Sequence, residues 1–277
     1  MANSNDEKIN NHYGKVDIFK NIIKQLEHNN IDTNNLTCQD LDSFDQFHIG
    51  GKLATKELAQ FAQLPEGMKI LDIGCGIGGP ARTLAFEFKC DVVGVDLTEE
   101  YVKAGKKLTE LIGISNRIKF HQGDATNLSF DSNQFDYVWL QHITMNIEEK
   151  LKLFKEIKRM LKDDGKLVFY EIIKGNDEPI SYPVFWSATE ELSFLINEKM
   201  YRKALEDAGL KEEKWEDKSS FAIDWFQSML DQMKVDGPPK LGLKVIVADD
   251  VPIKAQNILN GLNEEKLRVV RAIYSNG

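Results

Sequence analysis

The stretch that decides the fold reads Leu71-Asp72-Ile73-Gly74-Cys75-Gly76-Ile77-Gly78-Gly79. It follows a short apolar run and precedes a helical pattern. The glycines therefore predict a tight turn that lets a ligand approach the backbone at the start of a helix. The spacing Gly74-x-Gly76-x-x-Gly79 also satisfies the fingerprint of dinucleotide-binding enzymes. The loop alone leaves its ligand open.

Around this loop, short apolar runs alternate with amphipathic stretches. The predicted strands are 69–73, 91–96, 118–122, 135–141 and 166–172. The predicted helices between them are 79–88, 99–112 and 148–161, the last followed by a turn at 163–165. A helix at 197–208, a strand at 211–217 and a final strand at 267–274 lying against it complete the pattern. This alternation predicts an α/β fold, with a mostly parallel seven-stranded sheet and helices on both faces.

Other segments do not follow this alternation of strands and helices. Residues 1–10 are polar and are expected to be disordered, and 11–66, with helices at 16–28 and 53–64, form an N-terminal helical cap. The main domain then spans 67–277. Its insertions at 175–196 and 219–261 are rich in aromatic residues and proline, and the second contains two predicted helices. Such insertions either form lids over a substrate pocket or extend the core.

Composition narrows the class of protein. The 277 residues are 42% hydrophobic and 29% charged, as expected for a globular protein, and no apolar run has the length of a membrane span. Three cysteines without paired spacing favour the cytoplasm and predict no metal site. The net charge of −9 argues against a nucleic-acid partner and suits a neutral or cationic small molecule, although acidity can serve solubility alone.

Three carboxylates follow successive predicted strands. Asp72 precedes the first glycine, where it would repel a pyrophosphate but attract the cationic amino-acid end of a cofactor. Asp96 suits both hydroxyls of a ribose, and Asp124 could accept a hydrogen bond from an adenine amine. Each acid alone could be a helix cap or a turn former. Together they match the parts of one ligand, S-adenosylmethionine.

The motifs "LDIGCGIGG", "VVGVD", "GDA" and "FDYVWLQHITMNI" occur in this order and resemble those of class I S-adenosylmethionine-dependent methyltransferases. The resemblance implies the Rossmann-like methyltransferase fold. It also implies that residues at the strand ends bind the methionine part, the ribose and the adenine. These residues are Asp72, Gly74, Gly76, Asp96, Leu97, Asp124, Ala125 and Gln141.

Upstream, "DQFHIGGKLAT" is similar to the segment that precedes the core in sarcosine/dimethylglycine and phosphoethanolamine N-methyltransferases. The similarity implies that Gly50 and Gly51 approach the cofactor, together with Tyr13, His48 or Gln46. A helix N-cap with flexible glycines explains the glycine pair equally well.

The chain departs from phosphoethanolamine enzymes after the fourth strand. Where those enzymes have a histidine this chain has Asn146, and it instead places His142 next to Gln141. Their catalytic arrangement and substrate are therefore not carried over.

Two residues are candidates for catalysis. His142 follows a strand end and titrates near neutrality, so it is either a general base or a histidine with a structural hydrogen bond. Glu171 ends the fifth strand and either holds a cationic amine or is a structural acid. Aromatic residues could form a cage around a methylated ammonium or pack in the core. They are Tyr182, Phe185, Trp186, Trp215 and Trp225, and Tyr170 beside Glu171 is a further candidate to contact the substrate.

The sequence thus predicts methyl transfer from S-adenosylmethionine to a small molecule, most simply an amine such as glycine, sarcosine or dimethylglycine. O- or C-methylation of a phenol, quinone or lipid is the alternative within the same class. An NAD-dependent oxidoreductase and an inactive cofactor-binding subunit are the alternatives from other classes. The acceptor, and whether the protein is a monomer or a homodimer, stay open.

Overall fold

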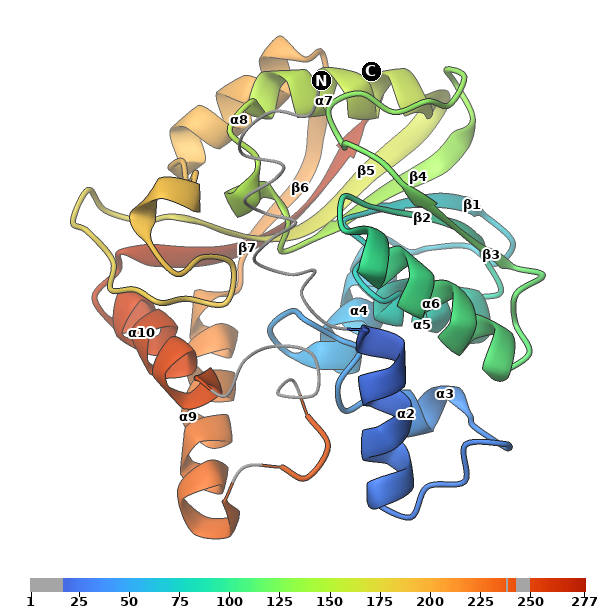
Figure 1. Ribbon diagram of the computed structural model, residues 1–277. Helices are drawn as coiled ribbons and strands as arrows, with labels where there is room; N and C mark the ends of the chain where they lie inside the picture. The colour runs from blue at the N-terminus through green and yellow to red at the C-terminus, as the bar shows by residue number, and fades with distance from the viewer. Residues whose placement is uncertain (1–16, 238, 243–249) are drawn as a thin grey trace. The chain divides into compact units, whose positions relative to one another are not determined.

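A computed structural model describes residues 17–237, 239–242 and 250–277 (Figure 1). Tyr13 and the predicted disorder of residues 1–10 lie outside the described residues. Seven strands form one sheet in the order β3-β2-β1-β4-β5-β7-β6, with parallel pairing in its first part and an antiparallel β7. The predicted α/β fold with a mostly parallel sheet is confirmed. None of the described helices is both long and apolar enough to span a membrane.

The described residues divide into two compact units. Residues 17–125 and 239–242 belong to the first, and residues 126–237 and 250–277 to the second. The strands of the first unit are β1 (Lys69–Ile73), β2 (Asp91–Asp96) and β3 (Ile118–Gln122), and all three have the predicted bounds. Its helices are α2 (Ile18–His28), α3 (Cys38–Leu41), α4 (Gly51–Phe61), α5 (Gly79–Glu87) and α6 (Glu99–Leu111).

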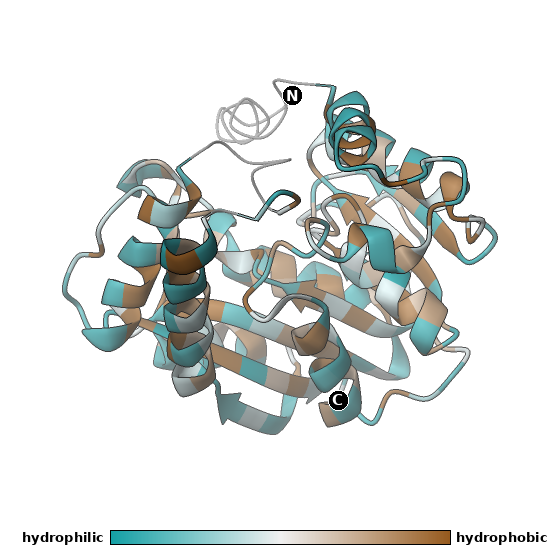
Figure 2. Cartoon of the chain, turned by 90° about the horizontal axis from the view of Figure 1, so that it is seen from below, coloured by the Kyte–Doolittle hydropathy of each residue, from teal (hydrophilic) through white to brown (hydrophobic). Residues whose placement is uncertain are grey.

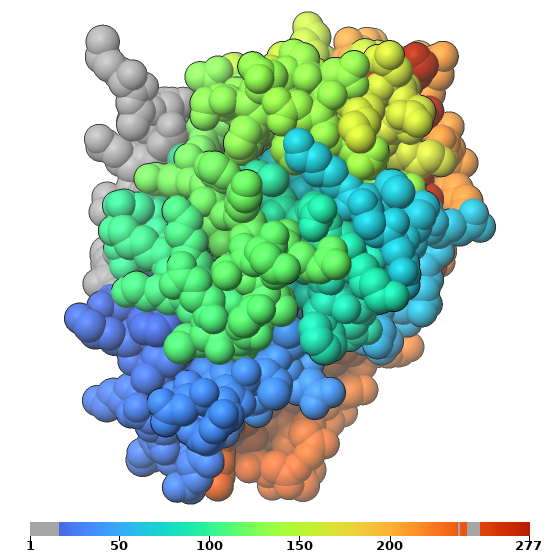
Figure 3. Space-filling model, turned by 90° about the vertical axis from the view of Figure 1, so that its right-hand side faces the viewer, coloured from blue at the N-terminus to red at the C-terminus, as the bar shows by residue number. Residues whose placement is uncertain are grey.

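The helices predicted as a cap share a buried cluster with α6 and with Ile77 of the glycine loop. The apolar side of α2 packs on α6, where Ile22 and Leu26 belong to the same buried cluster as Leu108. The helices α4 and α5 also contact each other. In Figure 3, blue residues of the N-terminal segment lie directly against blue-green residues that follow them in the chain. In the structure the cap and the glycine loop therefore form one unit.

The second unit contains β4 (Phe135–Gln141), β5 (Leu161–Lys174), β6 (Lys211–Asp217) and β7 (Leu267–Ser275). Its helices are η1 (Thr144–Asn146), α7 (Lys150–Met160), η2 (Glu190–Leu192), α8 (Glu198–Asp207), α9 (Ser219–Asp236) and α10 (Val251–Asn263). Hydrophobic and hydrophilic residues alternate along the longer helices, as expected of helices that cover a core (Figure 2). The last strand pairs with both β5 and β6, so its predicted place against 211–217 is confirmed.

Several predicted helix ends differ by one to three residues. The helix predicted from 16 begins at Ile18, because Asp17 caps it by accepting a hydrogen bond from the amide of Lys20 at 3.0 Å. The helix predicted at 53–64 begins earlier, at Gly51, since Gly50 takes the left-handed conformation that precedes it.

The turn predicted at 163–165 falls inside strand β5. The ladder pairs Phe135 with Leu161 and Tyr137 with Lys166, so residues 162–165 bulge out of the sheet between these two pairs. A bulge interrupts pairing without ending a strand. The prediction of a separate turn before a shorter strand was therefore wrong.

Candidate functional site

The glycine loop links β1 to α5 and has the tight geometry that the sequence predicts. Gly74 and Gly76 have φ angles of 73° and 53°, which glycine adopts without the strain of a side chain. The amide of Gly74 donates to the carbonyl of Val95 at 2.7 Å, and that of Gly78 to the carbonyl of Cys75 at 2.8 Å. The loop is thus fixed on the carboxyl side of the first two strands.

Asp96 at the end of β2 contacts this loop directly. Its Oδ2 accepts a hydrogen bond from the amide of Gly76 and its Oδ1 one from the amide of Thr98, both at 2.9 Å. Burial raises the pKa of Asp96, although these two amides oppose the effect. Each carboxylate oxygen can accept more than one hydrogen bond, so the predicted ribose contact remains chemically open.

Asp72 is the most unusual group of the site. The residue is 2% exposed, and within the part of the chain that the structure describes its Oδ2 has no hydrogen-bond partner. Burial and the negative charge of Asp96 raise its pKa to about 7. A buried carboxylate without a donor or cation is costly, so this position calls for a ligand that supplies one.

The third predicted acid lies at the same edge of the sheet. Strand β3 runs parallel to β2, with Gln122 opposite Asp96, so Asp124 follows at the carboxyl ends of these strands. Asp124, its neighbour Ala125 and Leu97 are partly buried. The structure therefore brings the predicted acids of the first unit to one edge, which suits an extended ligand with a cationic end.

The segment before α4 is held by buried polar contacts. His48, 4% exposed, contacts the carbonyl of Gly51 at 2.8 Å and the hydroxyl of Thr55 at 3.0 Å through Nε2. Burial lowers the pKa of His48 to about 4, so the ring is neutral. Gln46 donates to the hydroxyl of Thr83 at 3.3 Å. These contacts favour the helix-start explanation of Gly51, and its cofactor contact stays a prediction.

Sequence analysis missed one buried ion pair in this unit. Arg82 of α5 and Asp45 are 1% and 3% exposed, with Nη2 and Oδ2 2.8 Å apart. The available signal was Arg82 itself, a charged residue among the mostly small and apolar residues Gly79–Ala85. A helix segment of that composition is expected to be buried, and a buried charge needs a partner.

In the second unit, His142 lies directly after β4 in the left-handed region, with φ of 53°. Its backbone amide and its Nδ1 both lie within hydrogen-bond distance of the carbonyl oxygen of Tyr170, at 2.9 and 3.0 Å. A carbonyl only accepts, so Nδ1 carries the proton and the lone pair of the neutral ring is on Nε2. This tautomer suits a proton acceptor.

Glu171 is fully buried, and its carboxylate is used within the protein. It accepts hydrogen bonds from the amide of Ile143 at 3.1 Å and from the amide and hydroxyl of Thr144 at 3.1 and 2.9 Å. Burial raises its pKa to about 7. These contacts favour the structural alternative for Glu171, as the residue that holds the turn after His142.

The other predicted site residues of this unit lie in separate contacts, and only those of the insertion at 175–196 lie in the same segment. Gln141 accepts a hydrogen bond from the indole of Trp139 at 2.8 Å. Trp186 is buried and donates to the hydroxyl of Ser193 at 2.8 Å, in the same insertion as the half-buried Tyr182 and Phe185. Tyr170 is also buried.

The side chain of Asn257 in α10 donates to the carbonyl of Pro183 at 2.9 Å, so the two predicted insertions contact each other.

Two tryptophans lie elsewhere in the second unit. Trp215 is on β6, and the guanidinium of Arg202 already lies over its ring at 4.1 Å. Trp225 in α9 packs edge-on against Phe226 at 5.0 Å. Asn146, at the position noted as a departure, donates to the carbonyl of Trp186 at 2.9 Å and so ties η1 to the insertion.

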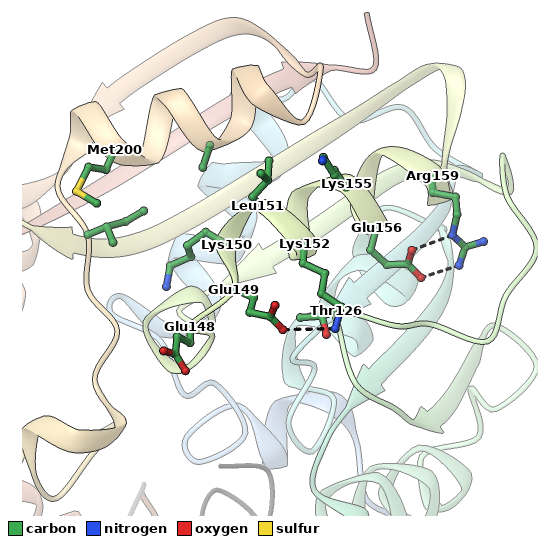
Figure 4. A pocket seen from close by; sticks show the side chains of 12 residues that line it. Thr126, Glu148, Glu149, Lys150, Leu151, Lys152, Lys155, Glu156, Arg159 and Met200 are labelled. Carbon is green, nitrogen blue, oxygen red and sulfur yellow. Dashed lines mark hydrogen bonds and ion pairs between the residues drawn. The ribbon is translucent and has the colours of Figure 1, made fainter. Parts of the chain in front are cut away.

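An open groove of about 810 Å³ lies along α7 and α8 (Figure 4). Lysine and glutamate side chains, including Lys152 and Glu149, dominate its lining, and none of the predicted site residues belongs to it. Among the residues that the structure describes, no group of histidine, cysteine, aspartate or glutamate is arranged to hold a metal ion.

Part of the chain is similar to known proteins. Residues 71–169 match the family model described as "Methyltransferase domain". Phosphoethanolamine N-methyltransferase 3 of Arabidopsis thaliana is 30% identical over 171 residues, which are 61% of this chain and 34% of that protein. Sterol 24-C-methyltransferase erg6 of Aspergillus fumigatus is 34% identical over 126 residues, 44% of this chain and 33% of that protein.

A solved structure has the same fold. It is phosphoethanolamine N-methyltransferase 2 of Haemonchus contortus in complex with S-adenosyl-L-methionine, with a TM-score of 0.71 and 20% identity. The match covers 95% of this chain and 60% of that one. The chain spans about a third of the length of the curated relatives given above.

Proposed function

We propose that this chain, which carries a methyltransferase domain in residues 71–169, transfers a methyl group from S-adenosylmethionine to a small molecule with an acceptor amine. The observation that carries the proposal is Asp72, a buried carboxylate beside a glycine loop whose Oδ2 has no partner among the described residues. The ammonium of an amino-acid ligand would supply both the charge and the hydrogen-bond donor that this oxygen lacks.

The residues of the first unit fit the parts of such a cofactor. Asp72 and the backbone at Gly74 would hold the amino-acid end, and Asp96 would accept hydrogen bonds from the ribose. Asp124, with Leu97 and Ala125, would meet the adenine. The cofactor supplies a methyl group on a sulfonium, which a nucleophile attacks in line from the side opposite the sulfur.

An amine can attack only through its lone pair, so an acceptor that arrives as an ammonium must first lose a proton. His142 is proposed to accept it at Nε2, since its Nδ1 faces the carbonyl of Tyr170. Glu171 is proposed to fix the turn that carries His142 rather than to contact the amine, because its carboxylate already accepts from Ile143 and Thr144. The aromatic residues Tyr182 and Phe185 are proposed to face the acceptor.

The similarity to phosphoethanolamine N-methyltransferases supports nitrogen as the acceptor. The similarity to a sterol 24-C-methyltransferase supports the second candidate, transfer to carbon of a lipid. The proposed location is the cytoplasm, since Cys38, Cys75 and Cys90 are all free thiols in the structure.

A panel of acceptors tests the proposal. Purified protein is incubated with S-adenosylmethionine and glycine, sarcosine, dimethylglycine, phosphoethanolamine, simple phenols or a sterol, and release of S-adenosylhomocysteine is measured. We expect release with at least one amine and not without an acceptor. Release only with the sterol or phenols would overturn N-methylation and leave methyl transfer standing. A thermal shift with NAD but not with S-adenosylhomocysteine would overturn the whole proposal.

A further inference from the structure

The buried guanidinium of Arg82 lies behind the glycine loop. Its Nη1 donates to the carbonyl of Ile77 at 2.8 Å, and Ile77 lies in the loop between Gly76 and Gly78. The same nitrogen donates to the hydroxyl of Thr109 in α6 at 3.3 Å. Arg82 therefore joins the loop to a neighbouring helix through groups that only an arginine fork reaches together.

The other side of the guanidinium holds the segment before α4. Nε and Nη2 of Arg82 lie 3.3 and 2.8 Å from Oδ2 of Asp45. We call residues 45–47 the strap, because they lie across the loop. A Cβ at Gly79 would come within 2.1 Å of the backbone carbonyl oxygen of Asp45, and one at Gly76 within 3.2 Å of the ring of Phe47. The loop and the strap are in direct contact.

The loop is thus fixed from two sides. Asp96 accepts a hydrogen bond from the amide of Gly76 at 2.9 Å, while Arg82 donates to the carbonyl of the next residue, Ile77. Burying a guanidinium and a carboxylate is costly, and a hydrophobic pair of similar volume would serve packing at least as well. Unlike a hydrophobic pair, the guanidinium of Arg82 also donates a directed hydrogen bond to the carbonyl of Ile77 in the loop.

We infer that Arg82 and Asp45 are positioning residues for the cofactor, which they do not touch. They hold the glycine loop in the conformation in which its backbone and Asp96 receive S-adenosylmethionine. This inference rests on the proposed function.

The test compares variants that weaken the hydrogen bond from Arg82 to the carbonyl of Ile77 to different degrees. Arg82→Lys keeps a positive charge for Asp45, but one ammonium cannot also reach Ile77 and Thr109 in the same geometry. We expect it to weaken S-adenosylhomocysteine binding by about 10- to 100-fold in calorimetry, as displaced supporting residues do elsewhere. We expect kcat at saturating S-adenosylmethionine to change by less than about 3-fold. Thr109→Val removes only the hydroxyl contact and is expected to change affinity by less than about 3-fold.

A second readout needs no ligand. Hydrogen exchange of a peptide covering residues 74–79 is measured in the protein alone, where Arg82→Lys is expected to speed exchange at least about tenfold, because loss of the hold favours local opening. Arg159→Lys is the matched control, since Arg159 in the second unit also pairs with a glutamate and donates to the carbonyls of Phe130 and Leu128. It is expected to lower stability without changing either readout.

The outcomes separate the possibilities. Lower stability of Arg82→Lys with unchanged loop exchange and unchanged affinity would mean that the pair is merely structural, and would overturn the inference. If the unaltered protein itself does not bind S-adenosylhomocysteine, the proposed function fails and the cofactor role of Arg82 falls with it. Loop exchange in Arg82→Lys would in that case still report whether Arg82 fixes the loop.

Discussion

The carboxylate of Asp96 accepts a hydrogen bond from the backbone amide of Gly76, with 2.9 Å between nitrogen and Oδ2. The acid predicted to bind a ribose therefore also sets the conformation of the loop predicted to bind the amino-acid end. Because one side chain serves both purposes, changes at Asp96 will not separate ligand contact from loop geometry. Tests of individual roles are sharper at residues with one set of contacts.

Asp72 allows a sharper test than Asp96, because its Oδ2 has no hydrogen-bond partner among the described residues. Its pKa of about 7 means that it is largely protonated below neutrality, whereas a cationic ligand requires the ionised form. We expect the affinity for S-adenosylhomocysteine to rise with pH between about 5.5 and 7.5, by up to about tenfold per unit below the pKa. Calorimetry across this range measures it.

Asp72→Asn keeps the shape of the side chain and removes its charge. It is expected to weaken binding by about 10- to 100-fold at pH 7.5, the usual worth of a hydrogen bond to a charged group. The pH dependence should disappear with it. Affinity that still rises with pH in this variant would assign the titration to another group.

His142→Ala tests the proposed proton acceptor. Removing a general base lowers kcat by about 100-fold or more, while the affinity for S-adenosylhomocysteine should stay within about 3-fold. His28→Ala, an exposed histidine at the end of α2, is the matched control and should leave both unchanged. Unaltered kcat in His142→Ala would remove His142 from the mechanism.

Glu171→Gln keeps one acceptor oxygen but replaces the other by an NH2 group, which cannot accept a hydrogen bond from the amides of Ile143 and Thr144. We expect the free energy of unfolding to fall by about 1–3 kcal/mol near pH 5 to 6, because buried hydrogen bonds are lost. If Glu171 fixes the turn after His142, kcat should fall more than the affinity for S-adenosylhomocysteine. Equal loss of both would argue against a role through His142.

The same carboxyl predicts how stability depends on pH. Folding raises the pKa of Glu171 from 4.5 to about 7, so the folded state binds this proton more tightly than the unfolded chain. The corresponding stability is complete below about pH 4.5 and is lost as pH rises through 7, at up to about 1.4 kcal/mol per unit. Urea unfolding at pH 5 and pH 8 should show a smaller difference in Glu171→Gln than in the unaltered protein.

Gly79→Ala tests the contact between strap and loop. A Cβ at this position would lie 2.1 Å from the carbonyl oxygen of Asp45, so the backbone must shift. We expect a loss of about 3 kcal/mol or a failure to fold. Gly113→Ala is the control, because nothing lies within 4 Å of its added Cβ and only its positive φ of 75° costs about 1 kcal/mol. Similar thermal stability of both variants would contradict the contact.

Much of this architecture could be predicted because it depends on local pattern. The bounds of β1 to β4 follow from short apolar runs, and Asp72 and Asp96 are recognisable by their place at strand ends. The pairing of Asp45 with Arg82 could not be predicted, since the two residues are 37 positions apart. Asp45 begins the segment "DQFHIGGKLAT", but nothing in that segment points to Arg82. The contacts of Glu171 could not be predicted from the sequence either. The turn at Thr144 lies near Glu171 only because β4 pairs with β5.

The place of β7 in the sheet has a consequence for how the protein is made. This strand is the last of the seven in chain order, yet it lies between β5 and β6, and β6 is at the edge. During synthesis both β5 and β6 leave the ribosome before β7, which pairs with each of them. Both strands therefore lack this neighbour until β7 has been translated. The second unit therefore reaches its final pairing only after translation of Leu267–Ser275, and chains released before that point expose two strand edges to aggregation.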